Sequence, residues 1–446
     1  MKIRSEMQAV RAGLRCSTIE AVFATIHLVL SQGVFLTNYV LDLGASNMVC
    51  GVVQALPFLA QFVFFLSPML VRRIRYRKPV VLLFAVTHRA AWILLILLLY
   101  VDWSQSMRLA VMLCTLLLSN FCAVIAGNAW FSWMTDLVPP TVRGAYYGRR
   151  NAYMGLTSLI TLFIGSQFLT VLRNAGCGNL GYTVCFSVAV LSAFFGAWML
   201  GRQYEPPLRP VPPISMRVFL SAMASKPVFK SFVRFYVIWN FFLGFAGPFF
   251  GVYMVRVLHM SPALMGYQAL IGSAMAFVGS RFWGRAIDRV GDRAVTLTSG
   301  ALISIQVLLW LASRDGVLWP VWVSAVVGGF SWSGFGIVAF SWPQRMCGKE
   351  ERQHTFGILG LFSGPAFMVG SLYGGFMTEI LPDVLFTIGN FQVLNFHLLF
   401  AVSSLGRLTS VALITKWSFP HDLYARTLPR CIVDTFKTFS YTYRQR

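Results

Sequence analysis

Apolar stretches of about twenty residues recur along this 446-residue chain, and no other feature constrains its fold as strongly. A helix of that length crosses the hydrocarbon core of a bilayer while satisfying its own backbone polar groups. The chain is 57% hydrophobic and its mean hydropathy is +0.67, which the surface of a soluble domain does not tolerate. The stretches are continuously apolar, whereas barrel strands alternate. We therefore predict an all-α integral membrane protein.

Twelve transmembrane helices can be placed, in two halves of six. The domains we predict are an N-terminal half (1–202), a proline-rich cytoplasmic linker (203–230), a C-terminal half (231–416) and a basic cytoplasmic tail (417–446). The predicted spans are 17–41, 47–71, 79–101, 108–133, 151–173, 181–202, 231–256, 264–284, 294–314, 317–343, 354–380 and 391–415.

The distribution of positive charge predicts the orientation. Of the 37 Lys and Arg, 29 fall in the termini and in the loops on the N-terminal side of the membrane. Four lie on the opposite side of the membrane, and the remaining four lie within spans. This bias places both termini in the cytoplasm, and we expect the cytoplasmic (inner) membrane. The net charge of +22 is therefore explained by topology and the lipid bilayer, and no nucleic-acid partner is expected.

No pattern in the chain predicts a cofactor, a metal or a catalytic residue. The eight cysteines are scattered, form no CxxC pair, and are interpreted as small buried hydrophobic residues. A GxxxxGK[ST] nucleotide-binding loop is absent, which argues against ATP-driven transport by this chain alone. We expect a monomer that is not an enzyme.

An internal repeat relates the two halves. At a constant offset of 209 residues, the loop after span four and the loop after span ten share Ser, Trp, Arg and Gly, and an aromatic residue also coincides. Such parallel repeats recur in transporters. The matched pairs are Ser132/Ser341, Trp133/Trp342, Arg143/Arg352, Tyr147/Phe356 and Gly148/Gly357.

The loop between spans eight and nine reads GRAIDRVGDR and concentrates charge in a chain that is only 12% charged. It resembles the signature loop of the major facilitator superfamily, with Gly284, Asp288, Arg289, Gly291 and Arg293 at the defining positions. The twelve spans, the two halves and the central linker resemble that superfamily over nearly the whole chain. The resemblance implies a transporter that rocks its halves around a midplane site.

The resemblance implies that the aspartate of this loop contacts the start of a helix from the other half of the protein. Here the expected partner of Asp288 is the start of span five, at Gly148, Arg149 and Arg150. A carboxylate at a helix N-terminus is favoured by the helix dipole, so the contact would favour the cytoplasm-closed state. Gly284 is expected to allow close helix approach and Gly291 a tight turn. The alternative is a solvated turn that only sets topology.

The corresponding loop of the first half departs from this pattern. When the two loops are aligned on their final basic residues, Met69 replaces the first glycine and Arg73 replaces the aspartate. The segment 72–78 carries five positive charges and no acid. We therefore expect the gate to be asymmetric between the halves.

Span one carries a polar stripe. Glu20, His27, Ser31 and Asn38 are spaced by 7, 4 and 7 residues, close to whole turns, so one face of the helix would be polar. Such a face cannot contact lipid. The resemblance implies that spans one, four, seven and ten line a central cavity, and polar packing between helices is the alternative.

Span three carries His88 and Arg89 near its midpoint. An arginine does not lose its proton, so Arg89 needs an acceptor. Glu20 is the nearest acid along the sequence, but its depth argues against a pair, and carbonyl groups or a bound anion are alternatives. Both a structural ion pair and a substrate contact remain open. Further cavity candidates on spans four, seven and ten are Asn120, Asn128, Tyr236, Asn240, Ser331 and Trp332.

The predicted function is secondary active or facilitative transport of a small polar solute by rocker-switch alternating access. The positive residues of the predicted cavity favour a small organic anion, and a proton carried by His27 or His88, or a counter-anion, is the candidate coupling ion. One alternative is a transporter-like sensor or assembly factor without flux. A weaker alternative is an intramembrane hydrolase that would use Ser333 with a histidine.

Overall fold

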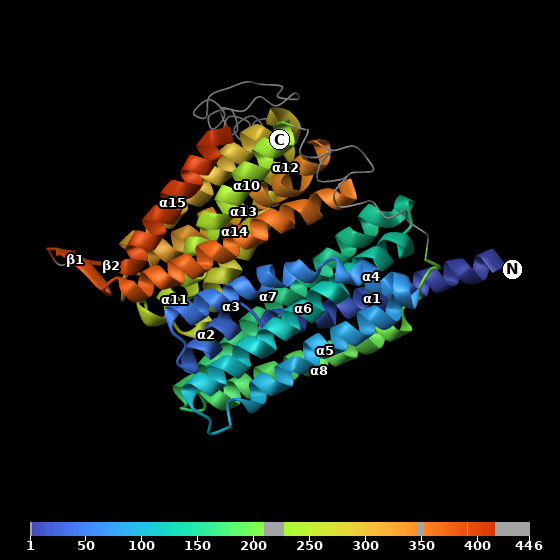
Figure 1. Ribbon diagram of the computed structural model, residues 1–446, viewed down its shortest axis with the longest axis horizontal. Coiled ribbons are helices and arrows are strands. Elements are labelled where there is room, and N and C mark those ends of the chain that lie inside the picture. Colours follow the sequence, from blue (N-terminus) through green and yellow to red (C-terminus); the bar gives the residue numbers. More distant parts are fainter. Residues whose placement is uncertain (1, 209–226, 347–351, 390, 415–446) are drawn as a thin grey trace. The chain divides into compact units, whose positions relative to one another are not determined.

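The structure is a computed structural model that describes residues 2–208, 227–346, 352–389 and 391–414, and most of these are helical (Figure 1). The chain forms two compact units. Unit 1 comprises Met1–Ser46, Leu59–Val211 and Met260–Gly266, and unit 2 comprises Asn47–Phe58, Pro212–His259 and Tyr267–Arg446.

Unit 1 is a bundle of long helices. In Figure 1 its helices α1, α5, α6 and α8 run side by side; α1 packs against α7 and α8, and α5 packs against α6 and α8. A buried cluster that includes Val80, Trp133 and Met134 forms part of its core. The elements are α1 (Lys2–Leu30), α2 (Val34–Asp42), η1 (Ala60–Val63), α4 (Leu66–Ile74), α5 (Lys78–Leu97), α6 (Gln105–Leu137), η2 (Pro140–Val142), α7 (Arg143–Asn174) and α8 (Gly178–Arg202).

Unit 2 is organised around α10, which packs against α14 and α15. Its core is rich in aromatic side chains, and Trp239 stacks on Phe335 with ring centres 4.5 Å apart. The elements are α3 (Asn47–Leu59), α10 (Pro227–Ala246), α11 (Phe249–Arg256), α12 (Pro262–Gln306), η3 (Val307–Ala312), α13 (Trp319–Met346), α14 (Arg352–Ile380), β1 (Val384–Ile388), β2 (Phe391–Leu394) and α15 (Asn395–Ile414). The last residue of α3 and the first residues of α12 belong to unit 1.

The long helices have the length and composition of membrane spans. Within the described residues, nine are long and apolar enough to cross a bilayer, or ten if the bent pair α3–η1 and α4 is one span. The count treats α12 as one helix although Gly291 interrupts it, and it does not include the 29-residue α14. The described helices are therefore consistent with the predicted twelve spans.

An exposed apolar face of α7 shows why this fold needs lipid. Leu156, Ile160, Ile164 and Val171 are 58%, 50%, 60% and 65% exposed, and their spacing places them on one face of the helix. An apolar face of this length is unfavourable in water and favourable in a bilayer. The chain is an integral, multi-pass membrane protein.

The observed helices differ from the predicted spans at several ends. The first span is broken at residues 31–33, where Gly33 has a φ of +55°, so α1 and α2 are separate helices. The seventh predicted span is likewise divided at Gly247 and Pro248, between α10 and α11. The predicted loop 285–293 is shorter than expected, because helix continues to Val290 and a kink at Gly291, whose φ is +82°, separates the two helices.

A small β-hairpin was not predicted. Strands β1 and β2 pair in antiparallel register in the region where span twelve was expected to begin. Both strands are rich in aromatic and β-branched residues, and Gly389 between them has a φ of +59°, which suits a tight hairpin turn. Because the hydropathy of this segment resembles that of a span, the sequence pattern alone did not distinguish the hairpin from the start of a transmembrane helix.

Candidate functional site

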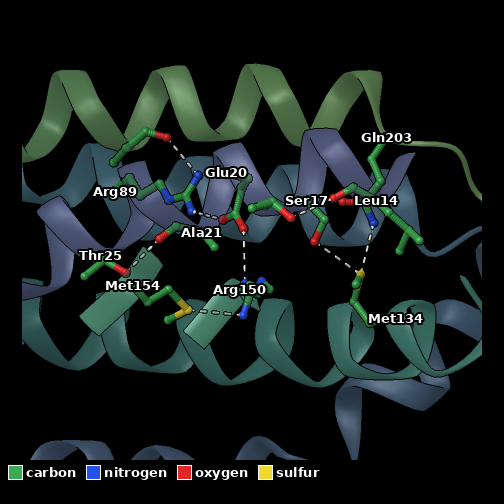
Figure 2. Close-up of polar contacts among 12 residues, drawn as sticks. Leu14, Ser17, Glu20, Ala21, Thr25, Arg89, Met134, Arg150, Met154 and Gln203 are labelled. Carbon is green, nitrogen blue, oxygen red and sulfur yellow. Dashed lines mark hydrogen bonds and ion pairs between the residues drawn. The ribbon is translucent and has the colours of Figure 1, made fainter. Parts of the chain in front are cut away.

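Three ionisable side chains meet in the interior of unit 1. The carboxylate of Glu20 on α1 accepts a hydrogen bond from the guanidinium of Arg89 on α5 at 3.1 Å, and a guanidinium nitrogen of Arg150 on α7 lies 3.7 Å from its other oxygen. Arg89 also donates to the carbonyl oxygen of Ala193 on α8 at 2.8 Å. Figure 2 shows the Glu20 carboxylate between the two arginines. We call Glu20, Arg89 and Arg150 the ionic cluster.

The contact between Glu20 and Arg89 corrects the sequence-based argument from depth. Helix α1 begins at Lys2, well before the predicted span. Gly13 of α1 and Lys78 of α5 both contact the end of α8, so they lie at one level. Measured along the helix axes, Glu20 lies about 10 Å beyond Gly13 on α1, and Arg89 lies about 16 Å beyond Lys78 on α5. An arginine side chain points back towards the N-terminus of its helix, and this closes the gap.

Arg150 carries the least compensated charge of the cluster. Its guanidinium lies 4.8 Å from the centre of the Trp130 ring and donates to the sulfur of Met154 at 3.3 Å. Its Nε is buried and has no hydrogen-bond partner among the residues that the structure describes. Arg150 was predicted to be a gating residue, a role that stays a prediction, and the structure places it beside Glu20. The ionic cluster therefore holds two guanidiniums and one carboxylate.

Two histidines lie near the ionic cluster on the same helices. The rings of His27 on α1 and His88 on α5 are 5.3 Å apart, edge to face. Nδ1 of His88 lies 2.7 Å from the hydroxyl of Ser119 on α6. His27 is 4% exposed, and neither of its ring nitrogens makes a well-formed hydrogen bond, although the backbone of Ala189 lies nearby. A buried imidazole without such a bond is costly, which marks His27 as a candidate for a role other than packing.

The predicted polar stripe of span one does not continue along the whole span. The break at residues 31–33 interrupts the helix, so the periodicity of α1 no longer fixes the direction of Asn38 on α2. Asn38 accepts a hydrogen bond from Arg173 at 2.7 Å, and Arg173 also pairs with Asp42. Ser31 is buried at the break and bonds only its local backbone. Asn38 is thus used in packing, as the alternative reading held, whereas Glu20 and His27 lie together near α5.

The remaining cavity candidates bond mainly to their own helices. The amide groups of Asn120 and Asn240 donate to the carbonyls of Leu116 and Tyr236, one turn earlier in each helix, at 2.7 Å. Such local bonds give no support for ligand contact. Asn128 donates to the Phe64 carbonyl at 3.5 Å, Tyr236 stacks on Phe232, Trp332 packs against Trp239, and the hydroxyl of the buried Ser331 has no partner.

Most predicted gating residues are exposed. Asp288 and Arg289 are exposed near the end of the first part of α12, and Gly148 and Arg149 are exposed on α7. Arg143 donates to the carbonyls of Thr135 and Val138 at the end of α6, and Arg293 donates to that of Ile414. The Arg352 side chain lies outside the described residues. The contact proposed for Asp288 would join the two units and stays a prediction.

The role expected for Gly284 is wrong. A Cβ atom added at Gly284 would meet no atom within 4 Å, so this glycine does not mediate close helix approach. Gly291 does need to be glycine, because its φ of +82° and ψ of 167° belong to a region that other residues rarely adopt.

Comparison with known proteins identifies the family. The sequence profile of the Major Facilitator Superfamily matches residues 21–371 and 231–419. The chain belongs to the major facilitator superfamily. Its fold is similar to that of the nucleoside transporter NupG, with a TM-score of 0.68 at 11% identity over 91% of this chain and 100% of that one.

Other solved members of the superfamily show the same fold. A mutant of the peptide transporter POT matches with a TM-score of 0.66 at 11% identity, over 90% of this chain and 93% of that one. A bacterial homologue of the iron transporter ferroportin, in an inward-facing state, matches with a TM-score of 0.67 at 14% identity, over 92% and 98%. Membership of the family, whose profile covers most of the chain, shows that the chain is a transporter and not an enzyme.

Curated relatives match a shorter part of the chain. The proton-coupled antiporter flippase LtaA of Staphylococcus aureus, strains N315 and Mu50, is 24% identical over 144 residues, which are 31% of this chain. The matched part covers about a third (35%) of the length of those relatives.

The hydrolase alternative also finds no support among the described contacts. The hydroxyl of Ser333 donates to the carbonyl of Phe330 in its own helix. The ring nitrogens of His397, which lies in the same unit as Ser333, contact the hydroxyl of Tyr253 at 2.9 Å and the backbone N–H of Leu394 at 3.2 Å. Neither group is arranged to activate the other.

Sequence reasoning missed a pair of contacts that distinguish the two superfamily loops. Arg77, in the first-half loop, pairs with Asp136 on α6. In the alignment of the loops, the counterpart of Arg77 is Asp292, which is buried and accepts a hydrogen bond from Ser341 on α13 at 2.9 Å. The charge at this position is therefore inverted between the halves. The signal is present in the aligned sequences, where an arginine stands opposite an aspartate.

Proposed function

We propose that this transporter carries a small polar solute, with an anion as the favoured cargo, across the cytoplasmic membrane by rocker-switch alternating access. Transport is facilitative or secondary active, the working unit is a monomer, and both termini lie in the cytoplasm. The internal repeat and membership of the superfamily support the mechanism, and the bias of 29 against four basic residues supports the orientation.

The ionic cluster supports the choice of an anion. Glu20 can neutralise one guanidinium, and Arg89 takes the shorter contact together with the Ala193 carbonyl. Arg150 is left with a 3.7 Å contact, an aromatic face and a sulfur atom, and its buried Nε has no partner. Placing an uncompensated cation away from water costs several kcal/mol. A carboxylate or phosphate of the cargo next to Arg150 would remove that cost.

The histidine pair supports a proton as the coupling ion. An imidazole ring can accept and release a proton, and His27 lies two turns from Glu20 on α1 without a well-formed hydrogen bond. The partial similarity to LtaA, which is a proton-coupled antiporter, points in the same direction. A counter-anion exchanged through the same cluster is the alternative.

The test is uptake by reconstituted vesicles. Anionic, neutral and cationic metabolites of matched size would be offered with and without a pH gradient. We expect uptake of an anionic solute, and we expect Arg150→Gln to weaken its apparent affinity about tenfold to a hundredfold, the usual value of a lost charge-assisted hydrogen bond. Arg15→Gln is the matched control, because Arg15 is an exposed arginine on α1, the helix that carries Glu20.

Two results would contradict the proposal. Uptake of a neutral solute with the same affinity in the wild type and in Arg150→Gln would exclude an anionic cargo bound by this residue. Binding without flux for every solute, in a folded protein, would instead support a sensor or an assembly factor.

A further inference from the structure

A hollow of about 500 Å³ opens in unit 1 where α1 and α5 begin and α8 ends. Its α1 wall consists of the small residues Ala9, Ala12 and Gly13, which leave the space unfilled. A Cβ atom at Gly13 would lie 3.2 Å from Tyr204, so the α1 backbone is held close to the chain that leaves α8. The indole of Trp133 donates to the Tyr204 carbonyl at 2.9 Å and holds that chain in place. The hollow is thus a built feature of the bundle end.

The charged groups on its wall are two cations and one carboxylate. The carboxylate of Glu205 accepts hydrogen bonds from the backbone N–H groups of Arg77 and Lys78, so its charge is compensated by the start of α5. The ammonium of Lys78 donates to the Gly201 carbonyl at 3.1 Å. No ion pair with an acid is made by Lys78 or Arg202 in the described part of the chain. The wall therefore has an excess of positive charge.

The hollow lies at the depth of lipid headgroups. Helix α8 is a candidate span that ends at Arg202, and the guanidinium of Arg202 lies 3.8 Å from the ring centre of Trp198, one turn earlier. Trp198 is 48% exposed. An exposed tryptophan next to a basic residue at the end of a span is typical of the membrane–water interface. Tyr76, which also lines the hollow, is 63% exposed.

The surrounding charge has the same sign. Three exposed arginines precede the hollow along the chain: Arg72 and Arg73 on α4, and Arg75 at the C-terminal cap of α4. Basic residues clustered at the end of a span attract anionic headgroups, and basic pockets between helices bind them. The apolar part of the wall, from Ala9, Ala12, Pro79 and Tyr76, is suited to the glycerol and upper acyl region of a lipid and not to a free inorganic ion.

We propose that this hollow is a binding site for an anionic glycerophospholipid, with the lipid phosphate held by Lys78 and Arg202 and the glycerol region lying against α1. The site is separate from the ionic cluster, and the proposal does not depend on the cargo. Its consequence is that the transporter retains one class of membrane lipid at the end of unit 1.

The test is lipid binding to the purified full-length protein in detergent, followed by native mass spectrometry. Phosphatidylglycerol and phosphatidylcholine with identical acyl chains would be titrated against each other. We expect selective retention of phosphatidylglycerol, and a loss of about fivefold in its affinity for Arg202→Gln, since each basic contact near a membrane surface contributes about that factor. Arg202→Lys keeps the charge and is expected to keep the selectivity.

Two further variants separate a defined site from diffuse attraction. Ala12→Phe fills the hollow without changing any charge and is expected to abolish the selective binding. Arg149→Gln removes an exposed charge elsewhere on unit 1 and is expected to leave it unchanged. Equal losses for Arg149→Gln and Arg202→Gln, or full binding by Ala12→Phe, would overturn the proposal. Displacement of the bound phosphatidylglycerol by inorganic phosphate as readily as by free phosphatidylglycerol would also overturn the proposal, because it would indicate a site for a soluble anion. The melting temperature of each variant would be measured to exclude misfolding.

Discussion

The carboxylate of Glu20 on α1 lies 3.1 Å from the guanidinium of Arg89 on α5, and the two side chains are 7% and 8% exposed. A pair buried this deeply joins two helices of unit 1 through charge and not only through packing. Neither charge would have a partner in lipid, so each side chain needs the other as its counter-charge inside the helix bundle. Arg150 adds a second cation to the same carboxylate.

The first prediction concerns this pair. Glu20→Gln leaves two buried guanidiniums without a counter-charge and should lower the free energy of unfolding by about 3–5 kcal/mol, the usual cost of removing one partner of a buried pair. Arg89→Gln should cost a similar amount, and the double variant should cost less than the sum. Thermal or denaturant unfolding in detergent measures all three. Additive effects would mean that the two residues do not stabilise each other.

The second prediction concerns Asp288. If the carboxylate binds the start of the fifth span in the closed state, Asp288→Asn should lower transport and shift the population towards the inward-open state by about 1–3 kcal/mol. Labelling of cysteines introduced on the cytoplasmic face would report the shift. Unchanged labelling would indicate that this exposed aspartate is part of a solvated turn.

The third prediction compares two glycines of the signature loop. Gly291→Ala should destabilise the protein by about 1–3 kcal/mol, because alanine does not readily adopt its backbone conformation. Gly284→Ala should be neutral or slightly stabilising, because helix surrounds it and a Cβ atom meets nothing within 4 Å. Melting temperatures in detergent distinguish the two. Equal effects would contradict the observed difference between the sites.

The fourth prediction concerns helix packing in unit 2. A Cβ atom at Gly329 of α13 would lie 2.0 Å from the Gly272 carbonyl oxygen of α12, so Gly329→Ala should force the backbones apart and cost about 1–3 kcal/mol. Gly336→Ala on the same helix is the control, since its Cβ would have no neighbour within 4 Å. A stable Gly329→Ala protein with unchanged transport would show that α12 and α13 can separate without cost.

The sequence by itself determined that the chain crosses a membrane repeatedly and that it belongs with transporters, and it predicted two related halves. These conclusions depend on properties of segments, because lipid requires about twenty apolar residues per crossing and a duplication preserves local motifs. The signature loop was also readable, although the helix over 285–290 and the hairpin at 384–394 were not.

Only the tertiary structure decided which ionisable residues meet. Arg150 looked like a gating residue because it follows Gly148 and Arg149, and Glu20 looked too shallow to reach Arg89. Their contact depends on how far α1 extends before the membrane, on the register between α1, α5 and α7, and on the backward direction of arginine side chains. The break at residues 31–33 likewise redirected Asn38 towards Arg173. Helical periodicity describes one helix at a time, and the relative height and rotation of neighbouring helices come only from their packing.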